Sequence, residues 1–442
     1  MISLKNKIRL KTQEYFGNYE VIDFLKNYRK SQFFTKNQIL KIQCEKLQKL
    51  INYSAKNIRF YSKYFKDNNL KPSVIKKPED LNKLPVMTKQ IYRKNFPQNI
   101  VDLKSNKKDL ILNNTSGSSG TPFTFYQTRR LRGQAAARLI LFYEWAGRKY
   151  GQSLARIWGI VNSDFKIKLF NKYIENALVI NAFNLSEKTF SDFFIKIKNK
   201  KPRLLEAYTS AAYAFSILME KYNLSLKIPS TIISGETLYD FQKDMIKDYF
   251  NTEIFNRYGC REFGNIAQEC QEHDGLHICE EDFIIEIVDD NNQLVKNGEK
   301  GKIIVTSLDN YSMPFIRYQI DDIGIISTKN CTCGRNLRMF EFIEGRVTDV
   351  IYSPAGKHIS LYFFALIFQG LSDFIKEFQV IQKKDSDELL LKVVPTKNYS
   401  NAINSKLINQ VMKMDDSFRI VVEKVDEIKP ESSGKKKYLK VL

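Results

Sequence analysis

Between residues 155 and 235, strand-like and helix-like segments follow one another in turn. ARIWGIV and STIIS have the character of strands, whereas SDFFIKIKNK and SAAYAFSILMEKY have the character of helices. Strands that alternate with helices usually form a sheet covered by those helices, so this region predicts an α/β core. At 442 residues the chain is longer than one typical core, which predicts two or more domains.

The flanking regions predict the remaining elements. Residues 20–70 have helical spacing and predict two or three helices; DLILNN and FTFYQ predict strands, and a helix follows over 129–147. Residues 283–308 predict β-hairpins, and the last hundred residues or so have strand, helix and strand character. The expected hairpin turns are Asn291-Asn292 and Asn297-Gly298.

The predicted fold class is therefore α/β, or α+β overall. We expect a large N-terminal domain of mixed sheets and helices over residues 1–344, which includes a helical segment over 1–100. We expect a small α+β C-terminal domain over residues 345–442.

Charge and hydropathy limit the partners. Lys plus Arg number 70 against 49 Asp plus Glu, a net charge of +21. The lysines are scattered, whereas a nucleic-acid footprint is clustered, so we predict no nucleic-acid partner. No run of about 18 apolar residues occurs and the N-terminal segment lacks a secretory leader, which predicts a cytoplasmic protein without a membrane span. Peripheral association with an anionic membrane surface stays open.

The stretch NNTSGSSGTPFTFY, residues 113–126, predicts a phosphate-binding loop between two strands. Glycines let backbone N–H groups approach an anion, and hydroxyls donate further hydrogen bonds. The loop has no lysine, so it is not the G-x-x-x-x-G-K-[ST] loop, and the strand after it separates it from the dinucleotide-binding fingerprint. The candidate ligands of phosphate are Thr115, Ser116, Gly117, Ser118, Ser119, Gly120 and Thr121.

Five further stretches follow this loop in order. They are SGETL at 234–238, RYGCREFG at 257–264, PFIRYQIDDIG at 314–324, GRVTDVI at 345–351 and ESSGKKK at 431–437. With TSGSSGTP and the earlier LPVMTK, the chain resembles the adenylate-forming ligase superfamily over nearly its whole length. It resembles most the phenylacetate–CoA ligase-like branch found among capsule and surface-polysaccharide genes.

The resemblance implies a two-step reaction that uses ATP and Mg²⁺. A carboxylic acid attacks the α-phosphate of ATP, which gives an acyl-adenylate and releases pyrophosphate. The thiol of CoA is the first choice for the acceptor of the acyl group, and an amine, for instance on a surface sugar, is the alternative. A non-catalytic nucleotide-binding subunit is a further hypothesis, since Arg261 and Thr348 depart from the family pattern.

The resemblance assigns roles to residues that match its motifs. Tyr258 and Gly259 correspond to the segment that stacks on adenine, and Gly235 and Glu236 resemble the segment at the adenine edge. Glu262 corresponds to the carboxylate on the Mg²⁺ side, and a hard oxygen ligand suits that ion.

The ribose and the reacting groups have further candidates. Asp322 stands where the family holds the ribose hydroxyls, because two acceptor oxygens suit a vicinal diol; Asp321 is the rival. Lys435 corresponds to the lysine that bridges the α-phosphate and the carboxylate, where a cation offsets the repulsion between two anions. Lys436 and Lys437 leave its register open.

Two departures from the family pattern lie near these motifs. Arg261, where the superfamily often has Thr or Ser, would place a cation near the α-phosphate or the carboxylate. Arg346 begins the hinge about which a mobile small domain would exchange Lys435 for the face that forms the thioester or amide, and its side chain would either reach a phosphate or fix the hinge. The usual pivot aspartate is replaced by Thr348.

The cysteines predict a second site. In a chain expected to be cytoplasmic, disulfides are a poor explanation for six cysteines. Cys331 and Cys333 form a C-x-C knuckle, and Cys270 and His277 lie upstream in ECQEHDGLHICEE. Three thiolates and one imidazole are an ordinary structural Zn²⁺ set, and some members of the branch carry zinc at the matching positions. His273 is the rival nitrogen ligand.

The acid does not follow from the sequence. Its pocket is expected among residues 158–184, 208–213 and Tyr258, and an aromatic, a fatty or a sugar acid agrees equally well with the motifs. The oligomeric state does not follow either.

Overall fold

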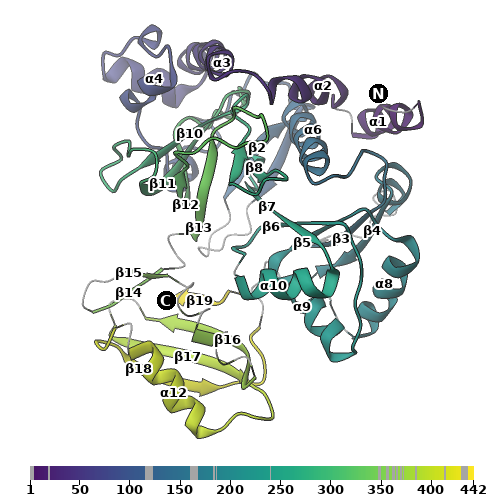
Figure 1. Ribbon diagram of the computed structural model, residues 1–442. Coiled ribbons are helices and arrows are strands. Elements are labelled where there is room, and N and C mark those ends of the chain that lie inside the picture. Colours follow the sequence, from purple (N-terminus) through teal and green to yellow (C-terminus); the bar gives the residue numbers. More distant parts are fainter. Residues whose placement is uncertain are drawn as a thin grey trace. The chain divides into compact units, whose positions relative to one another are not determined.

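The chain forms two compact units. The computed structural model describes residues 4–17, 20–114, 123–159, 168–182, 185, 187–238, 240–346, 350–354, 358–360, 364, 367–368, 371, 373–383, 386–412, 415–429 and 437–442. Residues 1–238 and 245–344 form the first unit, and residues 239–244 and 345–442 form the second (Figure 1). The predicted division of catalytic roles between two domains stays a prediction.

Helices dominate the N-terminal part of the first unit. They are α1 (Leu4–Gly17), α2 (Ile22–Ser31), α3 (Lys36–Asn57), α4 (Arg59–Asp67), the 3₁₀ helices η1 (Pro72–Val74) and η2 (Pro78–Lys83), and α5 (Lys89–Asn95). The helical spacing over 20–70 is thereby confirmed as α2, α3 and α4. Helix α3 begins with a capping box, in which Thr35 and Gln38 each bond the other's backbone N–H through their side chains. Its apolar face, which includes Leu47 and Ile51, joins the main hydrophobic core.

An eleven-stranded mixed sheet forms the framework of the first unit. Its order is β10-β11-β12-β13-β9-β8-β7-β6-β5-β3-β4. Strands β4, β3, β5, β6 and β7 are parallel, and antiparallel pairing links β7 to β8, β8 to β9 and β9 to β13. The strands are β3 (Leu154–Trp158), β4 (Ala177–Asn181), β5 (Leu204–Tyr208), β6 (Ser230–Ser234), β7 (Glu253–Cys260), β8 (Gly264–Glu269), β9 (Leu276–Ile278), β10 (Phe283–Val288), β11 (Lys300–Ser307), β12 (Tyr318–Ile326) and β13 (Met339–Arg346).

Helices cover both faces of the parallel strands, which confirms the predicted α/β core (Figure 1). One face packs against α8 (Glu187–Lys200), α9 (Thr209–Lys221) and α10 (Asp240–Phe250). The opposite face packs against α6 (Arg129–Trp145), which provides Tyr143 to a separate apolar cluster that also contains Ala146, the residue after the helix. A short π-helix, η3 (Phe170–Ile174), precedes β4.

The predicted phosphate-loop strands pair with each other. Strands β1 (Leu110–Asn114) and β2 (Thr124–Thr128) form a two-stranded antiparallel sheet. By contrast, the two hairpins predicted over 283–308 are one hairpin, β10–β11. Both turn sequences lie in its connection, since Val288 bridges to Leu294 and Gly298 donates its N–H to the Ile326 carbonyl before β11 begins.

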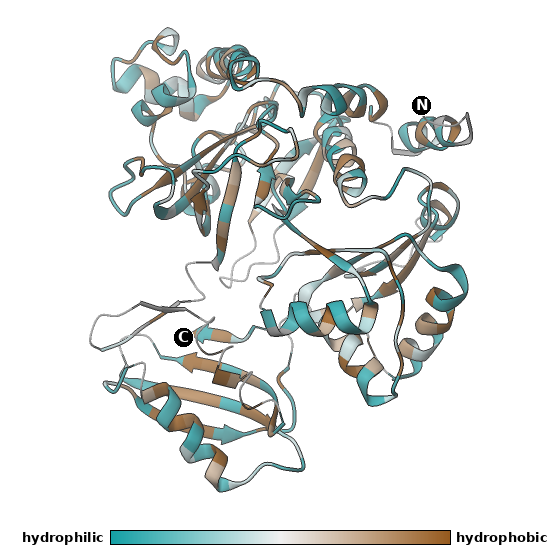
Figure 2. Cartoon of the chain, in the orientation of Figure 1, coloured by the Kyte–Doolittle hydropathy of each residue, from teal (hydrophilic) through white to brown (hydrophobic). Residues whose placement is uncertain are grey.

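The second unit contains a four-stranded sheet and one described helix. The sheet has the order β18-β17-β16-β19, and β14 pairs with β15 separately. The bounds are β14 (Val350–Tyr352), β15 (His358–Ser360), β16 (Ile375–Gln382), β17 (Glu388–Pro395), α12 (Asn401–Met412), β18 (Arg419–Lys424) and β19 (Leu439–Val441). Strands β16 and β17 carry hydrophobic stretches in Figure 2, and Leu407 of α12 packs into the same core. The α+β character predicted for this part is confirmed.

Candidate functional site

The ends of the predicted phosphate loop are held together by strand pairing. Asn114, the last residue of β1, lies opposite Thr124, the first residue of β2. The Thr124 hydroxyl donates to the Asn114 side-chain oxygen at 2.8 Å. The predicted phosphate ligands Thr115, Ser116, Gly117, Ser118, Ser119, Gly120 and Thr121 lie outside the described residues. The hairpin therefore fixes where the loop leaves and re-enters the fold.

Two separate motifs meet at Tyr258 and Asp322. Tyr258 lies in β7 and Asp322 in β12, and the tyrosine hydroxyl donates to the carboxylate at 2.6 Å. Burial raises the pKa of Tyr258 well above its ordinary value, so the hydroxyl remains a donor at neutral pH. The rival aspartate is held elsewhere, because Lys89 Nζ lies 2.8 Å from the carboxylate of Asp321. Only Asp322 thus contacts the predicted adenine-stacking residue.

Glu262 lies in the tight connection between β7 and β8. Its side chain is 6% exposed and accepts a hydrogen bond from the Tyr318 hydroxyl at 2.8 Å. Its backbone carbonyl accepts a hydrogen bond from the Gln127 side chain of β2 at 2.8 Å. Contacts to β2 and β12 therefore position this carboxylate beside both predicted nucleotide-binding segments.

The shape of this connection depends on glycine. A Cβ on Gly259 would lie 2.2 Å from the carbonyl oxygen of Gly264, so no side chain fits at that position. Arg261, in the same connection, is exposed. The structure brings Tyr258, Gly259 and Glu262 together, and it leaves Arg261 on the surface of the first unit.

Gly235 and Glu236 follow the carboxyl end of β6. Gly235 has φ +85°, a conformation that favours glycine. The Glu236 carboxylate accepts two hydrogen bonds from Ser210, one from the backbone N–H at 2.7 Å and one from the side-chain hydroxyl at 3.0 Å. Ser210 is in the first turn of α9, where backbone N–H groups lack helical partners, so Glu236 stabilises the start of this helix. Its predicted role at the adenine edge stays a prediction.

The predicted catalytic lysine lies outside the described residues, as do Lys436 and Thr348. Lys437 is described, and its carbonyl accepts a hydrogen bond from the Gln379 side chain of β16. Arg346, the predicted hinge residue, ends β13 and belongs to the second unit. The roles predicted for Lys435 and Arg346 stay predictions.

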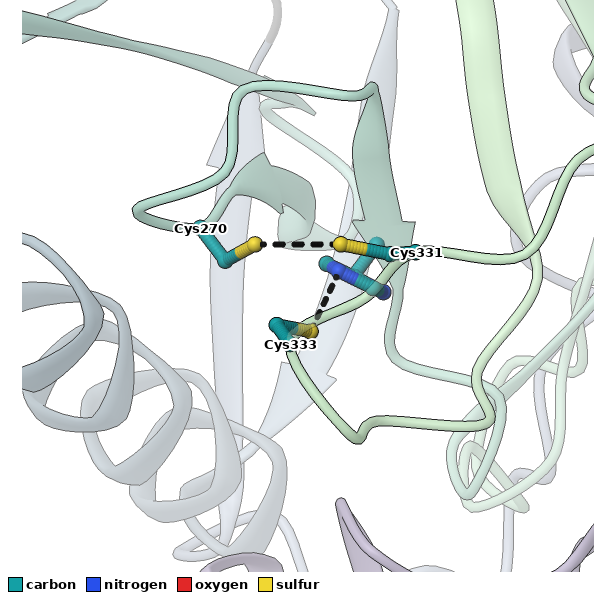
Figure 3. Close-up of side chains that lie close together, drawn as sticks. Cys270, Cys331 and Cys333 are labelled. Atoms are coloured by element: carbon teal, nitrogen blue, oxygen red, sulfur yellow. Dashed lines mark hydrogen bonds between the residues drawn. The ribbon is translucent and has the colours of Figure 1, made fainter.

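The four predicted metal ligands form one cluster. The sulfur atoms of Cys270, Cys331 and Cys333 and a ring nitrogen of His277 all lie within 4.8 Å of one another. The labelled cysteine side chains point toward one another in Figure 3, with 3.6 Å between the sulfurs of Cys270 and Cys331. Ligand atoms around tetrahedral Zn²⁺ lie about 3.8 Å apart, as follows from its bond lengths. The donor set and its spacing therefore fit a structural zinc site.

The two histidine candidates have different surroundings. His277 is fully buried, and its Nε2 lies 3.3 Å from the Cys333 sulfur. Burial lowers the pKa of His277 to about 4, which keeps the imidazole neutral, the form that binds metals. Both ring nitrogens of His273 instead lie 3.1 Å from carboxylates, those of Glu269 and Glu253. The structure thus brings His277, and not His273, to the cysteines.

The cluster spans the short seam between β9 and β13 of the sheet. Cys270 and His277 belong to the β8–β9 side, whereas Cys331 and Cys333 lie in the connection from β12 to β13. Across this seam β9 and β13 pair through His277 with Met339 and Leu276 with Phe340, and the Ile278 N–H donates to the Arg338 carbonyl at 2.9 Å. A metal held by all four side chains would therefore link the β10–β13 part of the sheet to the rest.

Several known proteins are similar to this chain. A family model described as the CapK C-terminal domain matches residues 351–441. The protein CapK of Staphylococcus aureus is 26% identical over 99% of this chain and 95% of its own length. A phenylacetate–coenzyme A ligase of Thermus thermophilus is 21% identical over 87% of this chain and 88% of its own length. The chain is a relative of the phenylacetate–CoA ligases. This confirms the predicted family and its enzyme class, the adenylate-forming ligases.

A solved structure agrees at the level of fold. A 2-hydroxyisobutyryl-CoA ligase in complex with an acyl-AMP has a TM-score of 0.76 and is 19% identical. The match covers 93% of this chain and 91% of the ligase, so the adenylate-forming fold extends over both units. In the part of the chain that the structure describes, no helix is long and apolar enough to cross a bilayer.

Three residues near these motifs escaped the sequence analysis. Lys89 ends the LPVMTK stretch, but only the fold pairs it with Asp321. Gln127 lies in a strand with no chemical signature of its own. Arg257 lies in the RYGCREFG motif, where no role was predicted for it. Its position directly before the candidate adenine-binding Tyr258 could have marked it as a candidate site residue.

Proposed function

We propose that this protein activates a carboxylic acid with ATP as an acyl-adenylate, releases pyrophosphate, and transfers the acyl group to the thiol of CoA. The observation that carries the proposal is the 2.6 Å contact between Tyr258 and Asp322, residues of two distant motifs. In this proposal Tyr258 packs against adenine and Asp322 accepts hydrogen bonds from the ribose. The relationship to phenylacetate–CoA ligases over most of the chain supports the same reaction.

The remaining roles follow the arrangement around Glu262. Its buried carboxylate, oriented by Tyr318, is the candidate ligand of Mg²⁺, which when bound neutralises charge on the polyphosphate. The β1–β2 hairpin positions the candidate phosphate loop 115–121. Lys435 is the candidate cation that stabilises charge between the α-phosphate and the attacking carboxylate.

Two further parts of the proposal concern the biosynthetic role of the protein and a bound zinc ion. The relationship to CapK supports a place in surface-polysaccharide biosynthesis, and the sulfur–nitrogen cluster supports a bound structural Zn²⁺. Zinc held there would stabilise the β9–β13 seam and would take no part in the chemistry.

Carboxylate-dependent exchange between ATP and labelled pyrophosphate tests the first step without any acceptor. We expect exchange with at least one acid in a panel of aryl, fatty, amino and uronic acids. No exchange across the panel, with ATP binding confirmed by calorimetry, would instead favour a non-catalytic nucleotide-binding subunit.

A second assay separates the two acceptors. With the acid found by exchange, the proposal expects an acyl-CoA product when CoA is added. Consumption of the acyl-adenylate by amines but not by CoA would assign the protein to amide formation instead.

A further inference from the structure

The carboxyl edge of the parallel strands carries a row of side chains, two of which, Trp158 and Tyr208, lie in segments where the acid pocket is expected. Strand pairing places Tyr208 and Ser234, the last residues of β5 and β6, beside Arg257, where the parallel pairing of β7 with β6 ends. Trp158, the last residue of β3, stacks on Tyr208 with ring centroids 4.0 Å apart and planes at 27°. We call these four residues the Arg257 row. Ligands of open α/β sheets bind outside this edge.

Arg257 is an incompletely paired cation. It is 5% exposed, and its Nη2 lies 2.7 Å from a Glu206 oxygen. Its Nε and Nη1 have no hydrogen-bond partner among the described residues. Buried guanidinium groups normally use their donors, since an unpaired buried donor costs stability.

Arg156 provides a matched comparison on the same face of the sheet. It lies opposite Glu206, two residues before the end of β3. All three of its nitrogens are used: Nε by Glu206, Nη1 by Glu175 and Nη2 by the Tyr143 hydroxyl. Of these two arginines, Arg156 uses every nitrogen although 14% of its side chain is exposed, whereas the more buried Arg257, at 4%, keeps two nitrogens without a partner among the described residues.

The carboxylate that faces Arg257 already has cationic partners. Two arginines, Arg156 and Arg257, pair with the carboxylates of Glu175 and Glu206. Burial alone would raise the pKa of Glu206, but the two arginines lower it to about 2, so this group is ionised at neutral pH. A neutral oxygen acceptor would satisfy the free donors of Arg257 and leave its ion pair with Glu206 in place, whereas a second carboxylate would compete with Glu206 for the guanidinium.

The aromatic pair indicates the shape of the ligand. Trp158 and Tyr208 are half-buried, and the guanidinium of Arg257 lies 5.7 Å from the Trp158 ring centroid. Stacked aromatic side chains favour a further ring offset over them. Arg257 directly precedes Tyr258 in β7, so the two residues are neighbours along the strand while their side chains leave its opposite faces.

We propose that the Arg257 row selects the acid substrate: a ring-bearing carboxylic acid with a neutral oxygen substituent, hydroxyl or carbonyl, that accepts hydrogen bonds from Arg257. The inference rests on the proposed acid-activating function. The ring packs on Trp158 and Tyr208, and the reacting carboxylate points toward the nucleotide. Arg257 is in this view a determinant of specificity.

The test compares matched acids in the pyrophosphate-exchange assay. The hydroxyl-bearing probes are 4-hydroxybenzoate, 4-hydroxyphenylacetate and galacturonate, which separate aryl acids from sugar acids. The hydrocarbon probes are benzoate, phenylacetate and cyclohexanecarboxylate, and terephthalate is the dicarboxylate. Wild-type protein should use at least one hydroxyl-bearing probe about 10- to 100-fold better, by kcat/KM, than its hydrocarbon counterpart or terephthalate.

Variants assign this preference to the row. Arg257→Lys keeps a cation for Glu206 but loses the forked donors, so it should remove most of the preference while hydrocarbon acids change less than about 3-fold. Arg203→Lys is the control, because this exposed arginine lies outside the row and donates to the Gly147 carbonyl at 3.2 Å. If Arg257→Lys does not fold, as judged by thermal unfolding, Trp158→Leu should raise KM for ring acids without changing the affinity for ATP.

Failure of this inference can be distinguished from failure of the proposed function. Selection by Arg257 would be rejected if exchange is fastest with the hydrocarbon acids, or if Arg257→Lys lowers exchange equally with every acid. Either result would leave the proposed ligase function in place. If no acid supports exchange, calorimetry with the same probes decides. If a hydroxyl-bearing acid binds and Arg257→Lys abolishes that binding, selection by Arg257 is kept and the acid-activating function is rejected. If no probe binds, both the selection and the function are rejected.

Discussion

Glu281 should make the protein less stable as pH rises toward neutrality. The side chain is 7% exposed and accepts a hydrogen bond from the Ser31 hydroxyl. Burial raises its pKa from 4.5 to about 7, and the neighbouring Asp282 contributes in the same direction. The unfolded chain thus loses this proton near pH 4.5, whereas the folded chain keeps it until about pH 7.

The sign and size of the effect follow from proton linkage. Between these two pKa values the folded state binds more protons than the unfolded state, so stability falls with rising pH and then levels off above pH 7. A pKa shift of this size changes the free energy of unfolding by about 3 kcal/mol. Glu281→Gln keeps the shape and an acceptor for Ser31 without an ionisable group. It should therefore stabilise the first unit by up to about 3 kcal/mol at pH 8 and have little effect at pH 4.5.

Urea unfolding of the full chain at several pH values measures this difference. Glu45→Gln, an exposed change on α3, is the control and should show no such pH dependence. An equal effect of Glu281→Gln at pH 4.5 and pH 8, or a loss of stability at pH 8, would refute a protonated buried Glu281.

Further predictions concern metal, nucleotide and catalysis. Cys331→Ser should abolish stoichiometric zinc by elemental analysis and lower the unfolding temperature, whereas Cys44→Ser should keep the metal; unchanged zinc would remove Cys331 from the site. Asp322→Asn should weaken ATP binding about 10-fold by calorimetry, and an equal or larger loss in Asp321→Asn would transfer the ribose role. Lys435→Ala should lower pyrophosphate exchange by about 100-fold or more while ATP still binds, and persistent exchange would point to another lysine.

The sequence by itself determined the elements and the motifs. Alternating strands and helices over 155–235 were enough to predict the α/β core, because their periodicity is local. The pairing of β1 with β2 around 115–121 was likewise readable from two strands flanking a turn. The merged β10–β11 hairpin was missed, since turn residues mark a change of direction without saying whether a strand follows.

Tertiary structure decided which residues meet. Asp321 and Asp322 are adjacent residues of the same type, and it is their contacts with Lys89 and Tyr258, respectively, that distinguish them. His277 joins the cysteines because β9 pairs with β13, a pairing between segments about sixty residues apart.

Arg257 gains its meaning in the same way. Its free donors become visible only when β5, β6 and β7 pair side by side and Glu206 takes a single nitrogen. Local sequence sets conformation and reactivity residue by residue, whereas neighbours in space are set by strand order and register. Register depends on how the whole apolar surface is buried, so no single stretch of the chain contains it.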